Sequence, residues 1–164
     1  MEEMRLEKKI EELLAEKKYS EIKDIFAQMN GADISALFEE VPENKIPLLF
    51  RLLPKVLAAE TFVEMEADAQ KMLIQGFSDN ELKDVFNELY LDDAVDIVEE
   101  MPANVVKRIL ANTDPDTRKM INEVLKYPDD SAGSIMTIEY VSLRLNMTVE
   151  EAIKRIRRTG VDKE

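Results

Sequence analysis

Apolar side chains recur along most of this chain at the three- and four-residue spacing of amphipathic helices. In the first such stretch, residues 4–14, they are Met4, Leu6, Ile10, Leu13 and Leu14. Charged residues occupy the positions between them, so a helix here would have one apolar and one charged face. The same spacing returns in further stretches of about ten residues. The pattern therefore predicts a succession of short helices, each of which buries one face.

Turn residues divide the chain at short intervals and predict where these helices begin. Ser20 and Asp33 are of the types that cap helix N-termini, and we expect one helix to begin after each. Ser78 precedes Glu81 by three residues, the spacing of a capping box. Further breaks are predicted at Pro42, Pro54, Pro102 and Pro115. Helices so closely spaced leave almost no room for long loops.

Two segments of the chain resemble each other. Residues 33–44 read DISALFEEVPEN and residues 93–104 read DAVDIVEEMPAN, so both carry a Glu-Glu pair two positions before a proline. Repetition of a helix pair is typical of an α-solenoid, and it predicts an all-α fold, a right-handed superhelix of short helices. The alternative is that two amphipathic helices resemble each other by chance.

The pattern changes after Tyr127. Residues 128–136 have the composition of a linker, Tyr140–Leu143 predicts a short strand, and Thr148 with Glu151 forms a capping box before a last helix. One strand and one helix cannot fold alone. We therefore expect a helical domain over 1–127, a linker over 128–136, and the incomplete beginning of an α/β domain over 137–164.

Composition narrows the partners of such a chain. It has 35 acidic and 22 basic residues, a net charge of −13, and neither cysteine nor histidine. A surface this negative disfavours nucleic acid and anionic lipid, and it suits cations, a basic protein surface, or simply solubility. Without thiolate or imidazole, a metal site would need oxygen ligands, which Mg²⁺, Ca²⁺ and Mn²⁺ prefer. We expect neither a signal peptide nor a membrane span, because no stretch approaches the ~20 apolar residues that a span needs.

Residues 91–100, LDDAVDIVEE, contain the densest acidic cluster. Asp92 and Asp96 are four positions apart, so on a helix they would share one face, separated by ~6 Å along the axis. Two carboxylates in this arrangement can share a hard cation, although a solvated helix face is the alternative. Glu60, which follows an apolar stretch, receives no role from its spacing alone.

Catalysis has little support in the sequence. Paired carboxylates can act as general acid and base, but they need a substrate platform, and the chain has no tryptophan and only 6% aromatic residues. Its four glycines are isolated, so no phosphate-binding loop is present. We expect a binding protein with neither catalytic nor cofactor-binding residues.

Three stretches resemble the cytosolic N-terminal region of the MgtE magnesium transporters. They are LLPKVLAAE (52–60), FSDNELKDVFNELYLDDAVDIVEEMP (77–102) and YPDDSAGSIMTIEYVSLRLNMTVEEAIKRIR (127–157). The last is similar to the junction into the family's first CBS domain. The resemblance covers most of the chain from about residue 31, and it is most specific at this junction.

The resemblance implies a function and a site. Family members are homodimeric membrane proteins, in which a superhelical N domain precedes paired CBS domains, a connecting helix and a pore. Mg²⁺ is both the transported ion and a regulatory ligand, which binds between the acidic N domain and the CBS and connecting-helix surfaces and favours the closed pore. The matching residues here are Asp92, Asp96 and Glu60.

The same resemblance implies where the chain acts. Its partners would be its own CBS and transmembrane domains, and its place the cytoplasmic face of the cell membrane. The partner carboxylates and most of the nucleotide site of a CBS pair would lie beyond Glu164. The alternative function is a helical-repeat scaffold for protein interaction, similar to those of the flagellar motor switch, which would not respond to Mg²⁺.

Overall fold

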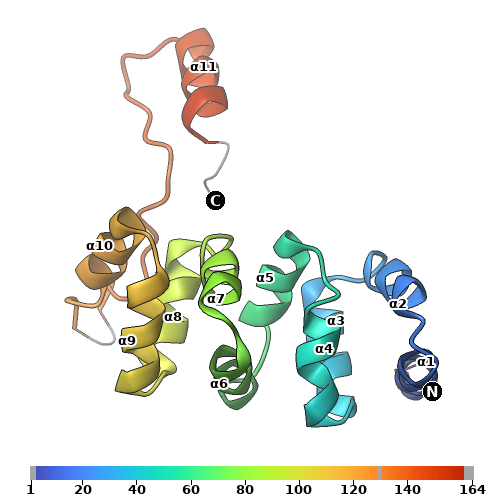
Figure 1. The fold of residues 1–164 in the computed structure, drawn as a ribbon. Coiled ribbons are helices and arrows are strands. Elements are labelled where there is room, and N and C mark those ends of the chain that lie inside the picture. The colour runs from blue at the N-terminus through green and yellow to red at the C-terminus, as the bar shows by residue number, and fades with distance from the viewer. Residues whose placement is uncertain (1–2, 129–130, 161–164) are drawn as a thin grey trace. The chain divides into compact units, whose positions relative to one another are not determined.

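Short helices joined by tight turns form the regular structure in this computed structural model (Figure 1), which describes residues 3–128 and 131–160. Side chains are described from Leu6 onward. The helices are α1 (Glu3–Ala15), α2 (Tyr19–Phe26), α3 (Gly31–Glu40), the 3-10 helix η1 (Glu43–Lys45), α4 (Ile46–Phe50), α5 (Lys55–Val63), α6 (Ala67–Gly76), α7 (Asp79–Phe86), α8 (Leu91–Glu100), α9 (Ala103–Asn112), α10 (Pro115–Val124) and α11 (Val149–Thr159). These residues contain no strand, and the predicted all-helical fold class is confirmed.

The helices belong to two compact units. The first contains the described residues up to Leu89 together with Glu100–Asp114, and the second contains Tyr90–Glu99 together with the described residues after Asp114. In the first unit α3 packs on α5, α5 on α7 and α7 on α9, while α1 contacts both α2 and α3. This succession of neighbouring helices follows from the apolar face that the periodicity predicts for each.

Aromatic rings fill the middle of the first unit. Phe50, Phe62, Phe77 and Phe86 form a contiguous cluster, in which ring centroids lie 5.4–6.4 Å apart. The four side chains are at most 5% exposed. Such tilted and edge-to-face contacts add to the free energy of burying the rings, so this cluster is the core of the unit.

Gly31 sets the distance between α3 and α5. It is buried at the first position of α3, and a Cβ atom there would lie 2.7 Å from the backbone carbon of Glu60 and 2.9 Å from the nitrogen of Thr61. Only glycine allows the two backbones to approach this closely. This contact fixes the part of α5 that carries Glu60.

The second unit contains α8, α10, α11 and the irregular segment between the last two. The apolar residues buried on α8 are Leu91, Ala94, Val95, Ile97 and Val98. On α10, Ile121 and Val124 are buried, whereas α11 has no buried residue. The capping box predicted at Thr148 and Glu151 is confirmed.

Local predictions of helix starts were partly wrong. The capping box at Ser78 is confirmed. Ser20, however, lies inside α2. Lys17, two residues after the end of α1, adopts the left-handed conformation at a φ of 57°, and the chain is helical again by Tyr19. Asp33 also lies inside a helix, because Asn30 caps α3 by accepting the Asp33 N–H at 2.8 Å.

The strand predicted for Tyr140–Leu143 is not present. These residues have no strand assignment, and no strand in the described residues is available to pair with them. A strand is held by hydrogen bonds to a neighbour, so its alternating side chains are insufficient without one. In the described part of the chain, no helix is both long and apolar enough to cross a bilayer.

Candidate cation site

The acidic helix α8 carries the two aspartates predicted as cation ligands. Because its apolar residues are buried, Asp92 and Asp96 lie on its other side, one turn apart. Asp92 is half-buried and belongs to the first turn, whereas Asp96 is exposed. The structure thus confirms the helix on which the pair was expected, and it places both residues off the buried apolar side of that helix.

Comparison of α8 with α3 shows that the fold does not need these acids. The two helices correspond when the sequences are aligned on Asp33 and Asp93, and both end at the second glutamate of the Glu-Glu pair. In this alignment Asp92 corresponds to Ala32 and Asp96 to Ala36. The acidic pair is therefore an addition to the repeated framework, as expected of residues with a specific role.

The electrostatics of the pair are unfavourable in the absence of a cation. The Oδ1 atom of Asp92 is buried and has no hydrogen-bond partner among the described residues. The pKa of Asp96 is raised above its ordinary value of 3.8, first because partial burial disfavours the charged carboxylate and second because Asp92 repels it. A positive charge beside the pair would oppose both effects.

The chemistry of the pair fits a hard divalent cation, but only as part of a coordination shell. Mg²⁺ binds through carboxylate oxygens and retains several waters, so one or two carboxylates are a usual protein contribution. In residues 3–128 and 131–160, no group of three or more acidic side chains is arranged to hold a metal. The pair would therefore bind weakly by itself, or be completed by another surface.

Glu60, the third predicted ligand, lies near the end of α5 in the first unit. Its side chain is exposed, while Ala58 and Ala59 before it are buried. Its backbone is held by the close contact with Gly31. Glu60 therefore presents an exposed carboxylate from a fixed backbone position, in a different unit from Asp92 and Asp96.

Glu139 is a residue at this site that sequence reasoning missed. Its Oε2 atom accepts the Leu91 N–H at 2.8 Å, at the first residue of α8. The two residues are 48 positions apart, so no local pattern connects them. Tyr90 before the helix is not a specific signal, because Lys18, Pro54, Glu66 and Pro102 also precede helices without a side-chain cap.

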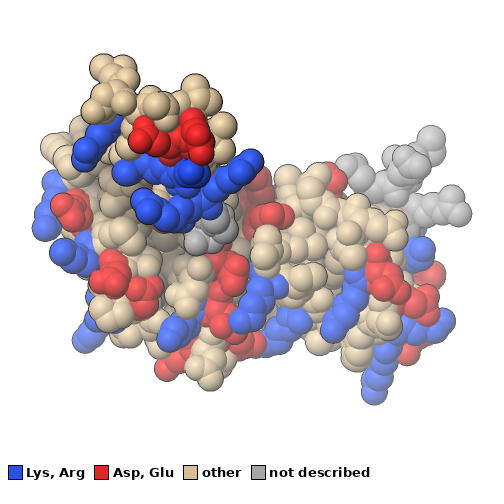
Figure 2. Space-filling view, turned by 90° about the horizontal axis from the view of Figure 1, so that it is seen from above, with Lys and Arg blue, Asp and Glu red and all other residues tan. Residues whose placement is uncertain are grey.

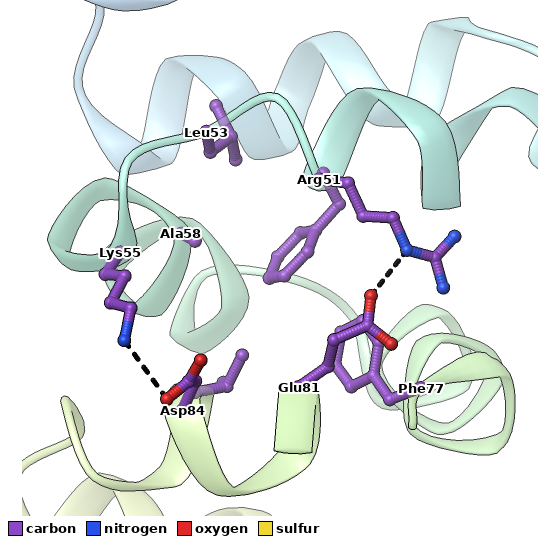
Figure 3. A pocket seen from close by; sticks show the side chains of 9 residues that line it. Arg51, Leu53, Lys55, Ala58, Phe77, Glu81 and Asp84 are labelled. Atoms are coloured by element: carbon purple, nitrogen blue, oxygen red, sulfur yellow. Dashed lines mark hydrogen bonds and ion pairs between the residues drawn. The ribbon is translucent and has the colours of Figure 1, made fainter. Parts of the chain in front are cut away.

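A cavity of about 310 Å³ among α4, α5 and α7 is a less suitable cation site. On its rim the Arg51 Nε donates to Glu81 Oε1 at 2.6 Å, and Lys55 Nζ donates to Asp84 Oδ1 at 3.1 Å (Figure 3). The Arg51 hydrogen bond, followed by that from the Ser78 backbone, lowers the pKa of Glu81 to about 2. These carboxylates are already neutralised by bases, whereas no ion pair of Asp92 or Asp96 is found among the described residues.

Basic side chains gather in the last part of the chain. Arg144, Lys154, Arg155 and Arg158 line a hollow of about 410 Å³ beside α11. Over the face seen in Figure 2, basic and acidic side chains are interspersed. The net charge of −13 is therefore not spread as one uniform negative field, and the local acidity of α8 is the more informative feature.

A stack of short helices with an added acidic pair defines an all-helical repeat domain suited to binding. The profile of the family described as the MgtE intracellular N domain matches residues 29–130, more than half of the chain. The chain belongs to this family.

Two curated relatives support this membership. The chain is 32% identical over 166 residues to the magnesium transporter MgtE of Thermus thermophilus, a match that covers 99% of the chain and 37% of the relative. It is 23% identical over 145 residues to the magnesium transporter MgtE of Bacillus subtilis, covering 88% of the chain and 32% of the relative. The chain thus spans about a third of the length of these relatives.

Solved structures show the same fold. The crystal structure of the cytosolic domain of the Mg²⁺ channel MgtE in complex with ATP matches with a TM-score of 0.85 and 30% identity, covering 94% of this chain and 63% of that one. The crystal structure of the soluble part of a magnesium transporter matches with a TM-score of 0.82 and 23% identity, covering 99% and 64%. The second likeness concerns the fold alone.

Proposed function

We propose that this chain is the cytosolic regulatory region of a magnesium transporter, and that it senses Mg²⁺ through Asp92, Asp96 and Glu60. The observation that carries the proposal is the acidic pair on α8, where two aspartates replace the alanines of the equivalent helix and one buried oxygen has no partner among the described residues. Family membership and the magnesium transporters among its relatives support the choice of ion.

The proposed mechanism is electrostatic. The carboxylates of this chain face acidic groups of the CBS and connecting-helix regions, and without cations the two surfaces repel each other. Mg²⁺ between them changes repulsion into attraction, which holds the cytosolic part together and favours the closed pore. The response is limited by the preference of Mg²⁺ for the closed arrangement, so several weak sites together would produce the switch.

The proposal includes a division of the chain and its partners. Residues 1–127 form the helical sensing domain, 128–136 the linker, and 137–164 the beginning of the first CBS domain. The end of the family match at residue 130 supports a boundary in this region. The whole protein is proposed to be a homodimer in the cell membrane, with this region on the cytoplasmic face and with a binding rather than a catalytic role.

Protease protection of the full-length protein tests the proposal. A cation sensor becomes resistant to cleavage in its cytosolic region as Mg²⁺ is raised through the millimolar range, because the domains come together. NaCl at matched ionic strength is the control, since general screening affects both salts alike. A helical-repeat scaffold without cation sensing would be cleaved at the same rate in both salts, and that result would contradict the proposal.

A further inference from the structure

The described helices differ in how their first turns are capped, and at α2, α5, α6 and α9 the residue before the helix makes no side-chain cap hydrogen bond. At α3, α7 and α11 the residue just before the helix provides the cap, namely Asn30, Ser78 and Thr148. Each of these side chains accepts the backbone N–H three residues later. Such local caps are the usual solution for the N–H groups that a helix start leaves without partners.

At α8 the residue just before the helix is Tyr90, the counterpart of Asn30 in the aligned repeats. The Tyr90 carbonyl accepts the first helical hydrogen bond, from Ala94 at 3.0 Å, so Tyr90 holds the N-cap position. Tyrosine is not one of the side chains that cap the first turn. The acceptor is supplied by Glu139, which takes the N–H of Leu91.

The carboxylate of Glu139 is well suited to this role. Leu91 is only 3% exposed, so its N–H would lose a partner without gaining free access to water. A negative charge at a helix N-terminus is also favoured by the helix dipole. The backbone N–H of Glu139 donates to Thr137 Oγ1 at 3.1 Å, which helps to fix the residue in place.

We propose that Glu139 is the remote N-cap of α8, and that this bond ties the segment after α10 to the acidic helix. It makes Glu139 a positioning residue for the turn that carries Asp92. Through this bond, order in residues 131–147 and order at the start of α8 depend on each other. The consequence for Mg²⁺ rests on the proposed function: loss of the cap would loosen one of the cation ligands.

Hydrogen–deuterium exchange of the full-length protein without Mg²⁺ tests the cap. Glu139→Ala should speed exchange in the peptide covering residues 90–96 roughly fivefold, because losing a cap typically costs about 1 kcal/mol in a helix start. Glu139→Gln retains an acceptor oxygen and should preserve most of the protection. Unchanged exchange in Glu139→Ala would overturn the proposal. Because Mg²⁺ is absent, this result does not depend on whether the protein senses the ion.

A second variant distinguishes the capping of α8 from the link between that helix and residues 131–147. Tyr90→Asn introduces the local cap that α3 has, at a position whose side chain is 44% exposed. Added to Glu139→Ala, it should restore slow exchange at residues 90–96, whereas protease cleavage within residues 131–147 should stay faster than in the unmodified protein. If Tyr90→Asn restores both, the tie through Glu139 is refuted, because the segment would then follow the helix without the bond.

Discussion

At the scale of single residues, Gly31 is constrained by its close contact with the backbone of α5. Replacing it by alanine would place a Cβ atom against the backbone of α5, where no flexible side chain can move aside. Overpacking of this kind costs about 1–3 kcal/mol, so Gly31→Ala should lower the free energy of unfolding by this amount. Urea denaturation measures the change.

Gly76 is the matched control for this substitution. It also lies in a helix, but an added Cβ would meet nothing within 4 Å. Gly76→Ala should therefore be neutral or stabilise the protein by up to ~1 kcal/mol. If the two substitutions had equal effects, the close approach of α3 and α5 at Gly31 would not be the constraint that the structure indicates.

The raised pKa of Asp96 predicts how the stability of the folded protein depends on pH. The folded-state pKa of this residue is raised above 3.8, so its ionisation destabilises the folded state. This effect is absent below about pH 3.8 and is fully present once the pH exceeds the raised value. Asp96→Asn should therefore stabilise the protein at pH 7 without divalent cations by a few tenths of a kcal/mol, the usual cost of like charges at this spacing, ~0.2–0.5 kcal/mol.

Thermal unfolding of Asp96→Asn in the background of Asp92→Asn measures how much of this effect is due to repulsion by Asp92. With the neighbouring charge removed, Asp96→Asn should stabilise less, and the difference between the two backgrounds is the repulsion itself. A protein that is destabilised by Asp96→Asn at pH 7 in the absence of cations would contradict the unfavourable electrostatics described for the pair.

At the scale of elements, Arg108 connects three helices of the first unit. From α9, its guanidinium donates to the carbonyl oxygens of Ile74 and Phe77 and to Asp79 Oδ1, at the end of α6 and the start of α7. Charged hydrogen bonds to partly buried acceptors contribute ~1.5–3 kcal/mol. Arg108→Ala should lower the free energy of unfolding by about 2 kcal/mol.

Two further substitutions complete this test by urea denaturation. Arg108→Lys should recover less than half of the loss, because an ammonium cannot reproduce the forked geometry. Lys107→Ala, at the exposed neighbouring position, should change stability by less than ~0.5 kcal/mol. Equal effects at positions 107 and 108 would show that Arg108 does not connect the helices energetically.

The helices were predictable from sequence because periodicity directly reports the buried face. The residues at which these helices begin were less predictable. Asn30 and Asp33 are both capping residue types, separated by the distance between a cap and its donor, so the sequence permits either register. The structure decides for Asn30 through one hydrogen bond. Glu139 lies beyond any such local inference, because its partner is 48 positions away.

The residues of the candidate site were also predictable from the sequence, but their environment was not. Spacing alone indicates that Asp92 and Asp96 share a face, and the family resemblance adds Glu60. The Asp92 oxygen without a partner among the described residues and the raised pKa of Asp96 both depend on burial, which cannot be read from the sequence. The strand predicted at residues 140–143 failed for the opposite reason: strand formation depends on a partner that the local pattern does not include.

At the scale of the whole molecule, the acidic pair would act only as part of a larger assembly. No cluster of three or more metal-binding acids occurs in the described residues, and the chain spans about a third of its curated relatives. The proposed regulatory site thus needs acidic groups from other regions. Weak sites shared between domains suit a sensor, because their occupancy follows the arrangement of those domains.

The most direct test is the Mg²⁺ concentration for half-maximal protease protection of the full-length protein, compared between two double variants. Asp92→Asn with Asp96→Asn should raise it at least about tenfold, equivalent to ~1.4 kcal/mol. Glu99→Gln with Glu100→Gln removes the same charge from the other end of α8 and should leave it within about twofold. A Mg²⁺ response of the aspartate variant equal to that of the unmodified protein would contradict cation sensing by α8.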